Sequence, residues 1–79
     1  MEFELTVDKI LSAVLNLSSI SWDLSVSNCE AWDSLAQISI VTTIEQTFHL
    51  KVSGSDLPRL TSRTGMLGYL TEKLNHAQG

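Results

Sequence analysis

The sequence is poor in the residues that several classes of protein depend on. Its single cysteine, Cys29, excludes an internal disulfide framework, and a lone thiol suits a reducing compartment. The five lysines and arginines are scattered along the chain and the formal net charge is −4, which disfavours binding to a phosphate backbone. The sequence therefore predicts no nucleic-acid partner.

Long apolar runs and a targeting signal are also missing from the sequence. No stretch approaches the ~18–20 apolar residues that a membrane-spanning helix needs. The first residues, MEFELTVDK, lack the basic-then-apolar order of a signal peptide. Together with the lone thiol, these features indicate a cytoplasmic protein without a membrane span.

Histidines are too few and too isolated to suggest a catalytic or metal centre. His49 and His76 have no acidic residue patterned near them, so a Ser-His-Asp arrangement has no support in the sequence. With Cys29 they also lack the spacing of metal ligands. We expect this chain to bind no metal and to have no enzymatic activity of its own.

Length and composition indicate one small folded domain. The chain has 79 residues, of which 43% are hydrophobic and 18% are charged, which is typical of a small globular protein and too apolar for a disordered one. One proline and four glycines punctuate the chain without dividing it, and no internal repeat is present. We predict a single domain over residues 1–79 that is monomeric.

Apolar residues recur at helical spacing in three segments. This spacing predicts one helix over about residues 4–16, a second from Ser34 to about His49, and a final helix that begins near Thr61 or Ser62. The predicted apolar positions of the three helices are Val7, Ile10, Leu11, Val14 and Leu17, then Leu35, Ile38, Val41, Ile44 and Phe48, then Met66, Leu67, Leu70 and Leu74.

The remaining segments are predicted to be a long loop and a short helix. SDLPRL suggests one helical turn capped by Ser55 or Asp56. Residues 17–33 are rich in Ser, Asn and Asp, which predicts a loop held to the core by its apolar residues Ile20, Trp22, Leu24, Val26 and Trp32. Since no strand pattern is found, the predicted fold is all-α: a four-helix bundle of three main helices and one short helix, with a long loop after the first.

The start of the second predicted helix has two candidate caps. Ser34 and Gln37 fit the capping box S-x-x-Q, in which the serine hydroxyl accepts from a backbone N–H of the first turn and the glutamine reaches back. Asp33 can cap the same helix one residue earlier. If Asp33 is the cap, Ser34 becomes the first helical residue and its hydroxyl lies free at the end of the loop.

The apolar arc of this helix is wider than burial against its own core requires. At 100° per residue its apolar positions spread over about 220°, against the ~100° stripe of an ordinary surface helix. Leu35 and Ile38 lie on the edge nearest Ser34, with Thr42 and Glu45 in the same sector. Either the loop and the short helix cover this edge, or a partner binds it.

The motif DSL at residues 33–35, IEQTFHLKV, a short helix and LTSRTGMLGYL follow one another as in the acyl carrier proteins. The chain resembles this family from Val7 to Leu74, including the spacing to Phe48, Val52, Leu60 and Tyr69. The resemblance implies an all-α carrier of the size predicted above.

The resemblance also implies a cofactor and a function. Ser34 would receive 4′-phosphopantetheine from coenzyme A, and Asp33 and Leu35 would complete the motif that a phosphopantetheinyl transferase recognises. The thiol of the arm would hold acyl intermediates of the fatty-acid or polyketide type as thioesters for acyl-loading and acyl-processing enzymes. An aminoacyl or peptidyl carrier is an alternative, as is an unmodified helical interaction domain in which Ser34 only caps the helix.

The chain departs from the family in two places. Members commonly carry Leu-Gly-x before Asp-Ser-Leu, whereas this chain has Glu30, Ala31 and Trp32, so the loop before the helix could follow a different path. Many members have a second helix dense in acidic residues, but residues 35–48 contain only Glu45. We therefore expect a carrier of a specialised pathway, whose partners bind Leu35, Ile38, Thr42 and Glu45 with weak dependence on salt.

Overall fold

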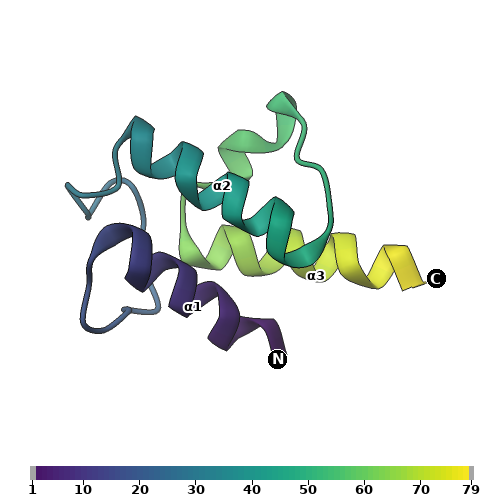
Figure 1. The fold of residues 1–79 in the computed structure, drawn as a ribbon, viewed down its shortest axis with the longest axis horizontal. Coiled ribbons are helices and arrows are strands. Elements are labelled where there is room, and N and C mark those ends of the chain that lie inside the picture. The colour runs from purple at the N-terminus through teal and green to yellow at the C-terminus, as the bar shows by residue number, and fades with distance from the viewer. Residues whose placement is uncertain (1, 79) are drawn as a thin grey trace.

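Three α-helices and one short 3₁₀-helix make up the fold, as predicted. A computed structural model describes residues 2–78, with side chains described for residues 3–74. The elements are α1 (Glu2–Leu15), α2 (Ser34–Phe48), the 3₁₀-helix η1 (Gly54–Leu60) and α3 (Arg63–Gln78). In Figure 1, α1 runs from right to left while α2 and α3 run from left to right. The all-α prediction is confirmed, and the residues between α1 and α2 form the predicted long loop.

The first two helices end where a residue takes the left-handed backbone conformation. Asn16 follows α1 with φ 56°, and His49 follows α2 with φ 55° and ψ 48°. The backbone N–H of His49 donates to the carbonyl of Glu45, which satisfies one of the last carbonyls of α2. Both helices therefore end one residue before the predicted positions.

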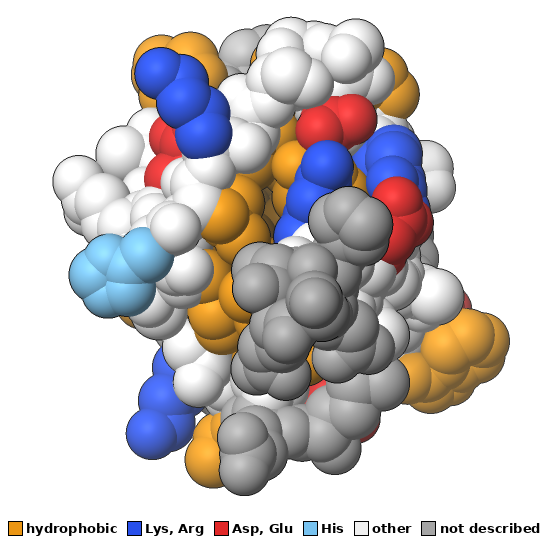
Figure 2. Space-filling model, turned by 90° about the vertical axis from the view of Figure 1, so that its right-hand side faces the viewer, with side chains coloured by type: hydrophobic (Ala, Val, Ile, Leu, Met, Phe, Trp, Pro, Cys, Tyr) orange, Lys and Arg blue, Asp and Glu red, His pale blue; other side chains and the backbone are white. Residues whose placement is uncertain are grey.

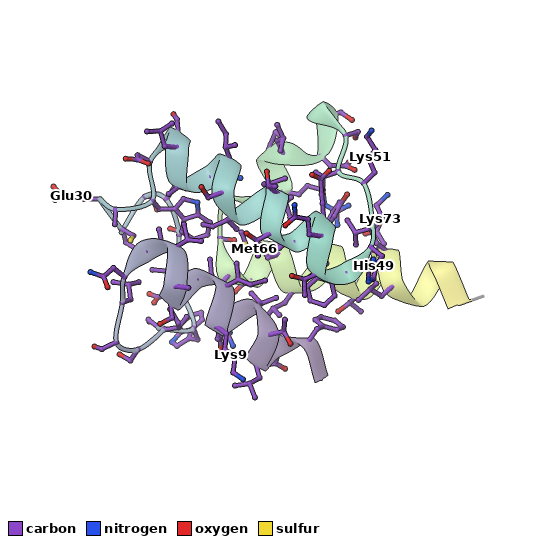
Figure 3. All side chains as sticks on the ribbon, in the orientation of Figure 1. Lys9, Glu30, His49, Lys51, Met66 and Lys73 are labelled. Carbon is purple, nitrogen blue, oxygen red and sulfur yellow. The ribbon has the colours of Figure 1, made fainter. Side chains whose placement is uncertain are left out.

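The core lies where the three long helices meet. Met66 is fully buried there and lies between them in Figure 3. Phe3 and Phe48 contact each other edge to face, with ring centroids 6.2 Å apart, and so join the start of α1 to the end of α2. The buried apolar residues are Val7, Ile10, Leu11, Leu15, Leu24, Trp32, Ile40, Val41, Ile44, Leu60, Met66, Tyr69 and Leu70.

The loop is held by fewer apolar residues than predicted. Leu24 and Trp32 are buried, but Trp22 is 75% exposed and Val26 is also exposed, so both were wrong as anchors. Backbone hydrogen bonds replace them: the N–H of Val26 donates to the carbonyl of Thr61 at 3.0 Å, and that of Arg63 donates to the carbonyl of Leu24 at 2.8 Å. These bonds place the loop against the junction of η1 and α3.

The predicted caps of the short helix were wrong. It begins at Gly54 after Ser53, whose side chain makes no capping hydrogen bond. The carboxylate of Asp56 instead accepts a hydrogen bond from the hydroxyl of Tyr69 at 2.9 Å, which joins η1 to α3. At the next helix, the hydroxyl oxygen of Ser62 accepts from the N–H of Gly65 at 2.9 Å, so Ser62 caps α3 close to its predicted start.

Charged side chains of both signs are interspersed. Arg63 forms a two-point ion pair with Asp8, at 2.7 and 3.1 Å, which joins the start of α3 to α1. Arg59 pairs with Glu72 at 2.8 Å. Figure 2 shows blue and red side chains side by side on the end of the molecule where α3 finishes, and Figure 3 places Lys9 on α1, away from Lys51 and Lys73. The cations therefore form no stripe of one sign on this part of the surface.

Candidate functional site

Asp33, and not Ser34, caps α2. Asp33 has extended backbone angles, φ −95° and ψ −171°, and its Oδ1 accepts a hydrogen bond from the N–H of Ala36 at 2.9 Å. Its carbonyl accepts the first helical bond, from the N–H of Gln37 at 2.9 Å. An extended aspartate whose carboxylate reaches the third residue of the helix is a strong N-cap.

Of the two candidate caps, the capping box of Ser34 and Gln37 therefore does not form. The side chain of Gln37 instead bonds to the loop and to η1: its Oε1 accepts from the indole Nε1–H of Trp32 and its Nε2 donates to the carbonyl of Leu60 at 3.0 Å. Sequence reasoning missed this role because both partners are set by the fold and Leu60 is distant in the sequence. We call these two hydrogen bonds the Gln37 bridge.

Ser34 is the first residue of α2 and its side chain is exposed. Within the described part of the chain its hydroxyl makes no hydrogen bond. The helix geometry also leaves the N–H groups of Ser34 and Leu35 without an acceptor inside the helix. The free hydroxyl thus lies at the positive end of the helix dipole, where a negatively charged group attached to it is stabilised.

Trp32 holds the segment that leads into α2. Its side chain is only 4% exposed and belongs to the core, and its N–H is paired through the Gln37 bridge. The loop therefore enters the helix over a buried indole, with Asp33 and Ser34 turned outward. The prediction that Trp32 anchors the loop is confirmed.

A groove of about 420 Å³ opens beside Ser34. Its walls are mainly apolar and come from three parts of the chain: the loop, the first turns of α2 and the start of the segment after η1. We call it the Ser34 groove; its lining residues are Val26, Trp32, Asp33, Ser34, Gln37, Ile38 and Thr61. No local pattern points to Val26 or Thr61 as lining residues, because the hydrogen bond between their backbones brings them together only in the fold.

Neither the loop nor the short helix covers the apolar edge of α2 next to Ser34. Leu35 is 76% exposed and Ile38 is 63% exposed, and Thr42 is exposed in the same sector. Glu45 differs, because its Oε2 accepts a hydrogen bond from the N–H of Val52 at 2.9 Å and thereby holds the chain after α2. Of the four residues predicted to bind partners, three thus form an open, uncharged face.

Comparison with known proteins gives no relative. No family model, no curated protein and no solved structure matches this chain. A function for the site therefore has to rest on the chemistry of its own residues.

The described residues hold no group of three or more His, Cys, Asp and Glu side chains that could bind a metal ion. His49 caps the end of α2 through its backbone, and the side chain of His76 lies outside the described residues. None of the helices described is both long enough and apolar enough to cross a membrane.

The cap can be tested by itself. We expect Asp33→Ala to lower the free energy of unfolding by about 1 kcal/mol, because the N–H of Ala36 loses its acceptor. Asp33→Asn keeps an acceptor oxygen and should lose only a few tenths of this amount. Urea unfolding followed by circular dichroism measures both; equal loss in the two variants would mean that the charge, and not the hydrogen bond, stabilises the helix.

Proposed function

We propose that this protein is a carrier that holds acyl intermediates as thioesters on a 4′-phosphopantetheine arm attached to Ser34. The observation that carries the proposal is the free, exposed hydroxyl of Ser34 at the positive end of α2, beside an apolar groove. The capping role that competed for this serine belongs to Asp33. The resemblance of the sequence to acyl carrier proteins is the reason for proposing 4′-phosphopantetheine as the group attached to Ser34.

The attachment needs a transferase, because Ser34 has no base of its own. No histidine lies among the residues of the Ser34 groove. In the transfer, the Ser34 oxygen forms a bond to the phosphorus of the phosphopantetheine unit in coenzyme A. The phosphoanhydride bond breaks, adenosine 3′,5′-bisphosphate leaves, and the serine proton passes to the transferase. The new phosphodiester then lies at unpaired N–H groups of α2.

Loading is expected to depend on Ser34 alone. Incubated with coenzyme A and a broad-specificity phosphopantetheinyl transferase, the wild-type chain should gain the mass of one phosphopantetheine, measured on the intact protein. Ser34→Ala should gain nothing, while its free energy of unfolding stays within about 0.5 kcal/mol of wild type because the side chain is exposed. Ser39→Ala, which changes another exposed serine of α2, should load fully. Loading of Ser34→Ala would refute the proposal.

Partner enzymes are expected to bind the apolar face of Leu35, Ile38 and Thr42. This face carries no charge, and the nearby Glu45 already binds Val52. Raising the salt concentration from about 0.05 to about 0.5 M should therefore weaken binding to a partner by less than about threefold. Ile38→Ala should weaken it roughly tenfold, whereas Gln46→Ala, an exposed polar change on the same helix, should not. Titration by calorimetry at both salt concentrations measures this; a steep loss with salt would contradict it.

The same exposed face favours a second candidate, an unmodified helical interaction domain. Two large apolar side chains side by side, Leu35 and Ile38, are typical of a surface that binds a protein. In that case Ser34→Ala would leave every activity intact. An aminoacyl or peptidyl carrier would load on Ser34 in the same way and differ only in its cargo.

A further inference from the structure

We propose that the first segment of the arm lies in the Ser34 groove and that the cargo stays outside the helical core, so that this carrier takes short or polar acyl groups. This inference rests on the proposed function. Attachment to Ser34 fixes only one end of the arm, and the rest of the arm could lie in the groove, in the core or in solvent.

The groove fits the part of the arm that follows the phosphate. Ser34 is itself a lining residue, so whatever is bonded to its oxygen begins inside the groove. The segment after the phosphodiester is the pantoyl unit, whose quaternary carbon bears two methyl groups. Val26 and Ile38 both line the groove and are exposed, so they offer apolar surface that these methyl groups can cover.

The Gln37 bridge lies where this groove meets the core, because Gln37 and Trp32 line the groove and Trp32 also belongs to the core. It joins the indole of Trp32 to the carbonyl of Leu60, and all three residues are buried or half-buried. A chain that passed from the groove into the core here would break both hydrogen bonds. The polar groups of Trp32, Gln37 and Leu60 would then lose their hydrogen-bond partners at a half-buried position. This route is therefore unfavourable.

The space behind the bridge is occupied by side chains in close contact. Eight of the core residues, from all four elements, have no exposed surface; they are Val7, Leu11, Ile40, Ile44, Leu60, Met66, Tyr69 and Leu70. Protein interiors pack at the density of organic crystals, so an additional alkyl chain would have to push these side chains apart.

Polar contacts also hold η1 against α3. The buried Tyr69 donates from its hydroxyl to Asp56, and burial raises the pKa of this hydroxyl to about 12, so it remains a donor at neutral pH. The guanidinium of Arg59 lies 5.1 Å from the ring centre of Tyr69 and also pairs with Glu72. Lys73 lies 5.5 Å from the same ring. Moving η1 away from α3 would break the contacts of Asp56 and Arg59 together, whereas the contact of Lys73 with Tyr69 lies within α3.

A cargo held outside the core meets water along its whole length. A long alkyl chain in that position would leave a large apolar surface exposed and favour self-association. Short acyl groups, or acyl groups with hydroxyl or keto functions, expose little apolar surface. The closed core therefore selects this class of cargo.

The test compares chains of different length on the same arm. The protein is loaded from acetyl-, butyryl-, octanoyl- and decanoyl-coenzyme A by the broad-specificity transferase, and intact mass confirms each form. Thermal unfolding gives the Tm of each, and NMR spectra of labelled isoleucine methyl groups report on Ile38 in the groove and on Ile40 and Ile44 in the core.

We expect the Ile38 signal to move when the acetyl arm is attached. The signals of Ile40 and Ile44, and the Tm, should then stay the same from acetyl to decanoyl. A Tm that rises with chain length would overturn the proposal, since burial of only two methylenes would raise it by roughly 6–12 °C. An unmoved Ile38 signal would overturn the placement of the arm. Failure to load at all would count against the proposed function instead.

A pair of variants tests the bridge. Gln37→Ala removes both hydrogen bonds, and we expect its Ile40 and Ile44 signals to move when acetyl is replaced by decanoyl. Gln46→Ala changes an exposed glutamine of the same helix and should behave like wild type. For each variant, the signals of the decanoyl form are compared with those of its own acetyl form, so a loss of stability caused by the substitution does not affect the comparison. The same response in both variants would show that the bridge is not the barrier.

Discussion

Trp32→Ala should lower the free energy of unfolding by about 3–5 kcal/mol, the largest loss we expect from a single change. Trp32 is 4% exposed, and its indole fills the space between the loop, α2 and the junction of η1 and α3. Its removal also leaves the Oε1 of Gln37 without a donor. A domain of this length has roughly 4–12 kcal/mol of stability in total. The variant should thus be largely unfolded under mild denaturing conditions.

The measurement is urea unfolding followed by far-UV circular dichroism, which does not depend on the lost fluorophore. Trp32→Phe keeps an aromatic ring but loses the N–H and part of the packed volume, so its loss of stability should be smaller than that of Trp32→Ala. Trp22→Ala is the matched control, because Trp22 is 75% exposed and its removal should change stability by less than about 0.5 kcal/mol. Equal effects at the two tryptophans would mean that Trp32 does not anchor the loop to the core.

Alanine at the two glycines near the start of α3 should have effects of opposite sign. At Gly65 a methyl group would overlap the carbonyl oxygen of Arg59 and lie 2.9 Å from the hydroxyl oxygen of Ser62, so η1 and α3 would have to separate. We expect Gly65→Ala to cost about 1–3 kcal/mol. Gly68 has nothing within 4 Å of the same position, and Gly68→Ala should stabilise the helix by up to about 1 kcal/mol.

The two glycine variants are compared in the same unfolding experiment. Since both add one methyl group to one helix, the difference between them isolates the close approach of α3 to η1. If Gly65→Ala were also stabilising, the backbone of Arg59 would have to lie farther from Gly65 than in this structure.

The positions of the helices could be predicted from the local sequence pattern. The spacing of apolar residues placed both ends of α1 and α2 and the start of α3 within one or two residues of their observed positions, because amphipathic periodicity is a property of adjacent turns. The width of the apolar arc drew attention to the edge at Leu35 and Ile38, which the structure leaves exposed. Whether the loop covers that edge could not be decided from the sequence, because the path of the loop depends on backbone bonds to distant residues such as Thr61.

Polar side chains were harder to assign than apolar ones. Gln37 fits a capping box by its spacing, yet it bonds Trp32 and Leu60. Asp56 has the position of a helix cap, yet it bonds Tyr69. In each case a tertiary partner with better geometry outcompetes the local one, and such partners cannot be read from spacing. Asp33 is the exception, because its capping partner lies within its own helix.

The carrier proposal is tested most sharply by locating the modification on the loaded protein. Cleavage after Glu30 and Glu45 releases residues 31–45, which contain two serines, Ser34 and Ser39. Tandem mass spectrometry of this peptide should place one phosphopantetheine on Ser34 and none on Ser39. A modification on any other residue, or none on a chain shown to be folded, would contradict the proposal and leave Asp33-Ser34-Leu35 as the start of a helix that binds proteins through its apolar face.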